Sequence, residues 1–206
     1  MLEIVHGYER SERPELFKSM FRHRKSVFID QKQWELQPTE EEFEIDEFDR
    51  DDAVYICSLL PDGSLAGSVR MLSTTTDHMA VSAFKDMFPG LTVRSPTIWE
   101  GTRFVVPYDR RLQPNGASRA ACEVLLGICL FGLEYGISQM TAIYEAPMAR
   151  TFKKCGISHL ILGRHRSPEH GSLHFGLWDI SPELEASVRK ATGLHDVPHP
   201  VAVAAE

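Results

Sequence analysis

The sequence lacks a hydrophobic run long enough to cross a membrane. Its longest apolar run, Val124 to Leu133, is about half of the roughly 20 residues that a membrane-spanning helix needs. The first residues, MLEIVHGYER, lack the charged and then apolar pattern of a secretion signal. We therefore expect a cytoplasmic protein with no membrane partner.

Cysteine is scarce, and basic residues are fewer than acidic ones. The four cysteines form no CxxC pair and have no metal-like spacing with the nine histidines, which indicates reduced thiols and no metal site. The 29 acidic and 22 basic residues give a formal charge of −7. This balance argues against nucleic acid as a partner.

What remains is the composition of a globular protein. Of the 206 residues, 43% are hydrophobic and 25% are charged. No repeat, low-complexity tract or linker divides the chain. We expect one domain over residues 1–206, with a loose tail over about residues 198–206.

Apolar periodicity and turn residues predict alternating helices and strands. The predicted elements are a helix over 14–28, a hairpin over 53–60 and 64–72, a helical turn from Ser82, a strand over 97–106, a long helix to about Tyr135, a strand over 139–145, a short helix over 148–155, strands near 158–162 and 172–178, and a helix from Ser181 to Gly193. This order is typical of the α/β GNAT-like acyltransferase fold, a central mixed sheet flanked by helices. The fold alone does not specify the chemistry.

An acidic segment lies between Glu35 and Asp52, where ten acidic residues accompany one basic residue. Such a run is often only a solvated surface. Here Phe43, Ile45 and Phe48 interrupt the charges and should pin the segment to the protein, so that some carboxylates face inward. Inward carboxylates need cationic partners, because an unpaired buried charge is costly.

Three arginines are candidate partners for these carboxylates. Arg24 lies on the apolar face of the first predicted helix, although such a side chain can also extend to water. Arg70 and Arg103 lie in predicted strands. The planar guanidinium binds carboxylate at two points and stays protonated, so arginine suits such pairing.

Glu100 and Arg103 are three residues apart, so a regular strand would place them on opposite faces. Gly101 permits a bulge that re-aims one of them and leaves backbone N–H groups unpaired. Unpaired N–H groups beside a carboxylate can stabilise the oxyanion of an acyl-transfer intermediate. A bulge can equally be only structural.

The spaced residues together resemble a known family. The pattern is Arg24-x3-Phe28-x5-Trp34, then Glu44-x-Asp46-x2-Asp49, then Arg70, Phe84 and Glu100-x2-Arg103. From about residue 3 to 180 the chain resembles the LuxI-type acyl-homoserine lactone synthases, or autoinducer synthases. Gly101 and Thr102 depart from the family, which often has a larger residue and a serine there.

The resemblance implies an acyltransferase without a cofactor. In the family, the amine of S-adenosylmethionine attacks an acyl thioester, and the substrate's carboxylate then closes a lactone and releases methylthioadenosine. Carried over by position, it implies catalytic roles for Glu100, Asp46, Asp49 and Arg103, with Glu100 as the base, and S-adenosylmethionine binding by Arg24, Phe28, Trp34, Glu44 and Arg70.

The resemblance also implies an acyl pocket that includes Phe84 and Ala142, although Phe84 is expected mainly to pack. Family members that favour 3-oxo acyl groups often have a hydroxyl residue at the position that aligns with Ala142, within one residue. We therefore expect an unsubstituted acyl chain. Its length is not predicted.

Residues 146–168 contain five Lys or Arg residues and no acid, in a chain of negative charge. This contrast predicts a docking surface for acyl carrier protein, the expected acyl donor. The surface is centred on Arg150, Lys153 and Lys154. It extends to Arg110, Arg111 and Arg119 if the long helix starts close by. A solvated helix face is the plain alternative.

Two other functions remain open. The motif Gln113-Pro-Asn-Gly116-Ala-Ser118 nearly matches the phosphate loop of acetyltransferases that use CoA, with serine at the last position. A CoA-dependent N-acetyltransferase is therefore one alternative. The other is a non-catalytic sensor of S-adenosylmethionine or an acyl ligand.

Overall fold

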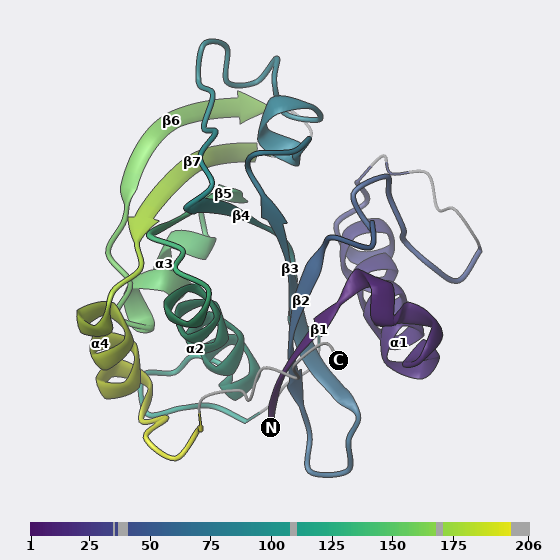
Figure 1. Cartoon of the computed structure of the whole chain (residues 1–206), viewed down its shortest axis with the longest axis vertical. Coiled ribbons are helices and arrows are strands. Elements are labelled where there is room, and N and C mark those ends of the chain that lie inside the picture. Colours follow the sequence, from purple (N-terminus) through teal and green to yellow (C-terminus); the bar gives the residue numbers. More distant parts are fainter. Residues whose placement is uncertain (35, 37–40, 108–110, 168–170, 199–206) are drawn as a thin grey trace.

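A computed structural model describes residues 1–34, 36, 41–107, 111–167 and 171–198. Its centre is a seven-stranded sheet of order β1-β2-β3-β4-β5-β7-β6 (Figure 1). The strands are β1 (Leu2–His6), β2 (Val54–Leu59), β3 (Leu65–Ser73), β4 (Ile98–Val105), β5 (Gln139–Glu145), β6 (Leu160–Ser167) and β7 (Gly171–Asp179). The helical segments are η1 (Gly7–Ser11), α1 (Pro14–Arg24), η2 (Lys25–Gln31), η3 (Met79–Val81), α2 (Arg119–Glu134), α3 (Met148–Lys154) and α4 (Pro182–Thr192).

Helices cover both faces of the sheet, with α1 on one side and α2 and α4 on the other (Figure 1). The alternation of β2 separates two cores, because successive side chains of a strand point to opposite faces. Ile56 packs with α2, whereas Tyr55 and Cys57 pack with Phe17 of α1. The predicted mixed sheet flanked by helices is confirmed.

The strands β4 and β5 form the parallel pair of the sheet and separate along their length. They pair only from Ile98 to Glu100 on β4 and from Gln139 to Thr141 on β5, although β4 continues to Val105 and β5 to Glu145. The open part of this pair is where the candidate site lies.

Most predicted elements are present, and the differences have local causes. The helix expected over 14–28 changes at Lys25 into the π-helical segment η2, where the 3.6-residue period no longer applies. The turn expected from Ser82 is present at residues 82–87, directly after the 3₁₀ segment η3, and β6 extends to Ser167. The strand β1 was not predicted, because it is a short edge strand that no turn residue links to its partner β2.

Two further expectations concern the ends and surface of the chain. The tail expected to be loose falls almost entirely on residues 199–206, which lie outside the described residues. Within the described ranges, no helix has the length and apolar character needed to span a membrane.

Candidate active site

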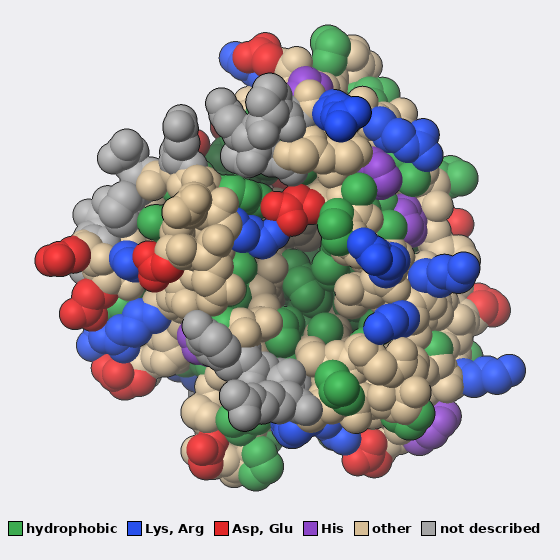
Figure 2. Space-filling view, turned by 180° about the vertical axis from the view of Figure 1, so that it is seen from behind, with side chains coloured by type: hydrophobic (Ala, Val, Ile, Leu, Met, Phe, Trp, Pro, Cys, Tyr) green, Lys and Arg blue, Asp and Glu red, His purple; other side chains and the backbone are tan. Residues whose placement is uncertain are grey.

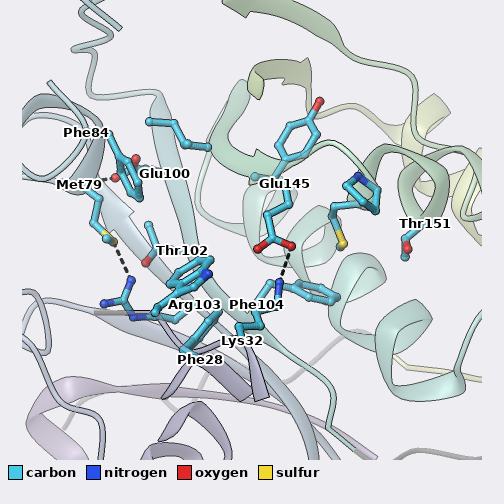
Figure 3. A pocket seen from close by; sticks show the side chains of 15 residues that line it. Phe28, Lys32, Met79, Phe84, Glu100, Thr102, Arg103, Phe104, Glu145 and Thr151 are labelled. Atoms are coloured by element: carbon cyan, nitrogen blue, oxygen red, sulfur yellow. Dashed lines mark hydrogen bonds and ion pairs between the residues drawn. The ribbon is translucent and has the colours of Figure 1, made fainter. Parts of the chain in front are cut away.

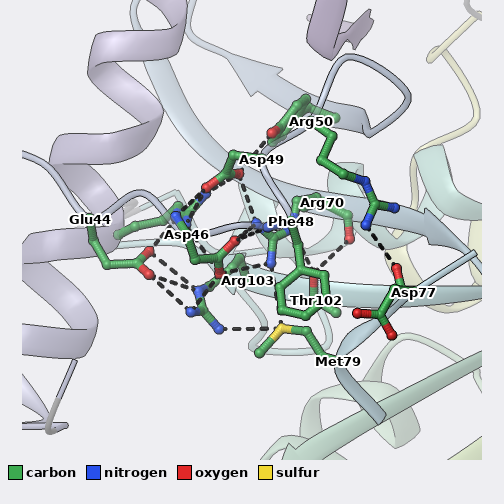
Figure 4. A network of polar contacts seen from close by, with 12 residues as sticks. Glu44, Asp46, Phe48, Asp49, Arg50, Arg70, Asp77, Met79, Thr102 and Arg103 are labelled. Carbon is green, nitrogen blue, oxygen red and sulfur yellow. Dashed lines mark hydrogen bonds and ion pairs between the residues drawn. The ribbon is translucent and has the colours of Figure 1, made fainter. Parts of the chain in front are cut away.

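Three arginines and three carboxylates form one buried network beside the open end of β4 (Figure 4). Four parts of the chain supply them: α1, the loop before β2, β3 and β4. The six residues are Arg24, Glu44, Asp46, Asp49, Arg70 and Arg103. The predicted inward-facing carboxylates and their predicted partners are therefore brought together.

Glu44 and Asp49 are each shared by two arginines, and Asp46 contacts all three, with Arg24 Nη2 3.8 Å from its carboxylate. Asp49 lies 2.7 Å from Arg24 Nη1 and 2.8 Å from Arg70 Nη1. Arg24 and Arg103 bind Glu44, and Arg70 and Arg103 bind Asp46. Because positive and negative groups are equal in number, the buried charges compensate one another.

Asp49 is enclosed within this network. Its carboxylate also accepts hydrogen bonds from the Tyr55 hydroxyl at 2.8 Å and from the Asp46 backbone N–H at 2.9 Å. Burial by itself would raise the pKa of Asp49, but the charges of Arg24 and Arg70 outweigh it and hold that pKa far below its usual range. Asp49 lines none of the three cavities described below. In this geometry Asp49 positions the two arginines, and the catalytic role that the resemblance implies for it stays a prediction.

Glu100 lies close to this network but bonds differently. Its side chain has 0% exposure, and its two oxygens accept backbone hydrogen bonds from Met79 (2.8 Å) and Ala80 (3.0 Å). Burial raises the pKa of Glu100 to about 7, against the lowering effect of these two N–H groups. A carboxyl group that is half ionised near neutral pH can exchange a proton with a substrate.

The predicted bulge in β4 is present, but at Arg103. Between the pairs Ser68–Val105 and Arg70–Thr102, β4 has two residues where β3 has one. Arg103 has a φ of 53°, in the left-handed region that non-glycine residues seldom adopt. Gly101 lies in the regular ladder, so the glycine was the wrong signal.

Three adjoining cavities surround these residues. The central cavity, of about 340 Å³, lies between the separating strands and is lined by Glu100, Thr102 and Arg103 of β4 and by Ile143, Tyr144 and Glu145 of β5 (Figure 3). The acidic cavity, of about 510 Å³, is lined by Glu44, Asp46 and Glu47 and shares Trp34, Phe84 and Glu145 with the central cavity. The helix-end cavity, of about 620 Å³, is lined by Gly116, Ser118 and Lys154 and shares Phe104, Met148 and Thr151 with the central cavity.

The predicted aromatic residues Phe28 and Trp34 form a stack that lines the central cavity. Phe28 and Trp34 are stacked with ring centroids 4.7 Å apart. The Arg103 guanidinium lies 5.5 Å from the Phe28 centroid, and the Lys32 ammonium lies 5.5 Å from the Trp34 centroid. These distances are typical of cation–π contacts.

The remaining predicted residues lie at different depths. Phe84 lines both the central and the acidic cavity. Ala142 is buried in the core on the α2 side and lines none of the three cavities. Arg150, Lys153 and Lys154 are exposed on α3, and Lys154 reaches the helix-end cavity.

Sequence reasoning missed several residues of this site. Met79 and Ala80 hold Glu100 through backbone N–H groups, which any residue type provides, so the sequence had no signal for them. Lys32 and Glu145 form an ion pair at the cavity although they are 113 positions apart. Tyr144 lines two cavities, but the sequence pattern of its strand is that of an ordinary core strand.

The chain is similar in sequence to known proteins. The family model "Autoinducer synthase" matches residues 8–187. An acyl-homoserine-lactone synthase of Rhizobium etli is 36% identical over 170 residues, covering 81% of this chain and 78% of that protein. An isovaleryl-homoserine lactone synthase of Bradyrhizobium diazoefficiens is 25% identical over 201 residues, covering 95% and 84%.

Solved structures show the same fold. A CoA-dependent acyl-homoserine lactone synthase, MesI, superposes with a TM-score of 0.82 at 26% identity and covers 98% of this chain and 100% of its own. An N-acetyltransferase from Lactobacillus plantarum, described as putative, has a TM-score of 0.55 at 12% identity, covering 87% and 99%, which supports the GNAT-like fold alone. With a family model that matches most of its length and a relative of 36% identity, the chain belongs to the autoinducer synthase family and is an acyl-homoserine-lactone synthase, an acyltransferase.

Proposed function

We propose that this synthase transfers an acyl group from acyl carrier protein to the amine of S-adenosylmethionine, which then closes to the lactone and releases methylthioadenosine. S-adenosylmethionine is consumed as a substrate, and no cofactor takes part. The observation that carries the proposal is Glu100, a buried carboxyl group with a pKa near 7, in a cavity that adjoins an acidic cavity on one side and a helix-end cavity on the other.

Glu100 supplies the proton acceptor that the first step needs. The substrate amine is protonated in solution and becomes a nucleophile only after it loses that proton. Glu100 takes the proton, directly or through a water molecule, because its pKa places enough of the ionised form at neutral pH. The amine nitrogen then bonds to the thioester carbon, and the thiol leaves.

The acidic cavity suits S-adenosylmethionine, which carries a positively charged sulfonium. Its lining has four carboxylates, Glu44, Asp46, Glu47 and Glu145, and one arginine, Arg103. Its volume of about 510 Å³ lies in the range of small-molecule sites. Trp34 and Phe84 add apolar surface for the adenosine. Arg24 and Arg70 act indirectly, by holding the carboxylates in place.

The start of α2 bears on which donor enters the helix-end cavity. Acetyltransferases bind the CoA pyrophosphate with free backbone N–H groups at the start of such a helix. Here the N–H groups of the corresponding turn are used within the chain: Gly116 donates to Gln113, Ala117 to Asn115, Arg119 to Arg111 and Ala121 to the capping Ser118 hydroxyl. Because these N–H groups are already bonded, they favour a donor whose pantetheine arm is attached to a carrier protein over one that needs a pyrophosphate site.

Basic side chains beside the cavities give such a carrier protein a surface. Arg150, Lys153 and Lys154 of α3 are exposed, as are Arg164 and Arg166 of β6. Figure 2 shows Lys and Arg side chains gathered along one side of a hollow with hydrophobic walls. Acyl carrier protein is strongly acidic, and such complementarity speeds association. Of the possible extension, Arg119 pairs with Glu123, and Arg110 lies outside the described residues.

A CoA thioester is the second candidate donor. MesI, the neighbour at 26% identity, is described as CoA-dependent. Its fold matches this chain over nearly the whole length, so the same fold serves that donor class in a relative.

Purified protein with S-adenosylmethionine tests the proposal and separates the donors. A series of acyl carrier proteins loaded with C4 to C12 acyl groups is compared with the matching acyl-CoA series, and lactone and methylthioadenosine are measured by mass spectrometry. We expect both products in equal amounts, with kcat/KM at least tenfold higher for the carrier protein. Higher kcat/KM with acyl-CoA would reverse the donor assignment. Binding of S-adenosylmethionine without methylthioadenosine would indicate a sensor, and acetylation of unrelated amines by acetyl-CoA would indicate an acetyltransferase.

A further inference from the structure

Lys32 makes two contacts at the mouth of the central cavity. Its ammonium lies over the Trp34 ring, 5.5 Å from the centroid, and forms an ion pair with Glu145 at the end of β5. The pair joins Lys32, which follows η2, to β5, and both residues line the central cavity (Figure 3). An aromatic ring and a carboxylate therefore hold one cation between them.

Trp34 and Glu145 both line the central and the acidic cavity, so the cation lies where the two meet. An aromatic face together with a carboxylate is a general recognition site for organic cations, because the ring quadrupole and the negative charge both attract them. The sulfonium of S-adenosylmethionine is such a cation. The Lys32 ammonium therefore occupies the position in which the sulfonium is expected to bind.

The buried network offers no equivalent site. Glu44, Asp46 and Asp49 are each held by two or three arginines, and a substrate cation would have to displace a guanidinium that has little access to solvent. Lys32 and Glu145 are 36% and 27% exposed. Lys32 can therefore exchange its contacts for water at little cost, since exposed ion pairs add little to stability.

We propose that Glu145 and Trp34 bind the sulfonium of S-adenosylmethionine and that Lys32 occupies this site until the substrate displaces it. The inference rests on the proposed function, which makes S-adenosylmethionine the substrate. Two consequences follow. Glu145 strengthens the binding of a sulfonium more than that of an uncharged thioether, and Lys32 competes with the sulfonium and weakens its binding.

Calorimetric titration with three ligands tests both consequences. S-adenosylmethionine carries the sulfonium, S-adenosylhomocysteine keeps the amino acid but has a thioether, and methylthioadenosine has a thioether and no amino acid. We expect Glu145→Gln to raise the Kd of S-adenosylmethionine about tenfold and those of the two thioethers less than twofold. We expect Lys32→Met and Lys32→Ala to lower the Kd of S-adenosylmethionine about threefold or more.

A matched control removes the effect of net charge. Lys25 lies in η2 and pairs with Asp30, away from the cavities, so Lys25→Met should leave all three Kd values unchanged. Equal weakening of the three ligands by Glu145→Gln would place Glu145 on the adenosine and overturn the inference. So would weaker S-adenosylmethionine binding in both Lys32 variants. If wild-type protein forms lactone but the Glu145 and Lys32 variants change the Kd values of the three ligands equally or not at all, the inference fails and the proposed function stands. If wild-type protein binds none of the three ligands, both fail.

Discussion

The Glu100 carboxylate accepts a hydrogen bond of 2.8 Å from the backbone N–H of Met79, and this contact ties the central strand β4 to the short helical segment η3. The second carboxylate oxygen bonds the next N–H in the same way. The carboxyl group is thereby fixed in orientation inside the cavity, while burial keeps its pKa near 7. A fixed carboxyl group of that pKa is suited to proton transfer.

Arg24→Ala should lower the free energy of unfolding by about 3 to 5 kcal/mol, because it leaves buried carboxylates with one cation too few. Arg22→Ala is the matched control on the same helix. Arg22 pairs with Glu42 at the surface, so its loss should change stability by less than about 1 kcal/mol. Urea denaturation measures both. Equal, small effects would mean that the Arg24 charge is not needed by the fold.

Glu100 should make stability fall as pH rises from 4.5 to about 7, and four histidines with lowered pKa values act in the opposite direction over part of this range (His23, His78, His159 and His174). Folding raises the pKa of Glu100 from 4.5 to about 7, so the folded state holds a proton that the unfolded state has lost, and stability falls as pH rises between these values. Folding lowers the pKa of Glu44, Asp46 and Asp49, so their contribution is lost as pH falls below about 4. Urea unfolding from pH 3 to 9 measures the curve. Glu100→Gln should lack the fall that the carboxyl group causes, so an identical pH dependence in this variant and in wild-type protein would contradict the raised pKa.

Reversing the charges of Arg150, Lys153 and Lys154 to Glu should raise KM for acyl carrier protein substrates several-fold and flatten its salt dependence. The KM for S-adenosylmethionine should stay nearly unchanged, because these side chains lie outside the acidic cavity. The control reverses Lys18, Lys85 and Lys190, which are exposed on other surfaces, with the same change in net charge. A carrier-protein KM that moves equally in both triple variants would make α3 an ordinary surface.

The product should carry an unsubstituted acyl chain, because the resemblance places Ala142 where family members that favour 3-oxo groups often have a hydroxyl residue. Ala142 is buried in the core on the α2 side and lines none of the three cavities, so this prediction rests on the resemblance. Mass spectrometry of the lactone extracted from an expressing culture settles the oxidation state. A 3-oxo product would refute the assignment of this position.

The charged half of the site was predictable, because buried carboxylates need cationic partners and the predicted elements supplied three arginines as candidates. Glu44 and Arg103 lie 59 positions apart and pair at 2.9 Å, as that argument requires. The partners of Glu100 were not predictable, because backbone N–H groups leave no trace in a sequence. The position of the bulge was missed because Arg103, and not Gly101, adopts the left-handed conformation that its ion pairs help to stabilise.

The pH dependence of amide formation in a single turnover, with wild-type protein and Glu100→Gln, tests most directly whether Glu100 is the base. The rate of wild-type protein should rise with pH, with an apparent pKa near 7, because only the ionised carboxylate accepts the proton. Glu100→Gln should bind S-adenosylmethionine normally, lose at least about 100-fold in rate and lose the acid limb of the profile. A variant that keeps both the rate and the limb would contradict the assignment of Glu100 as the base.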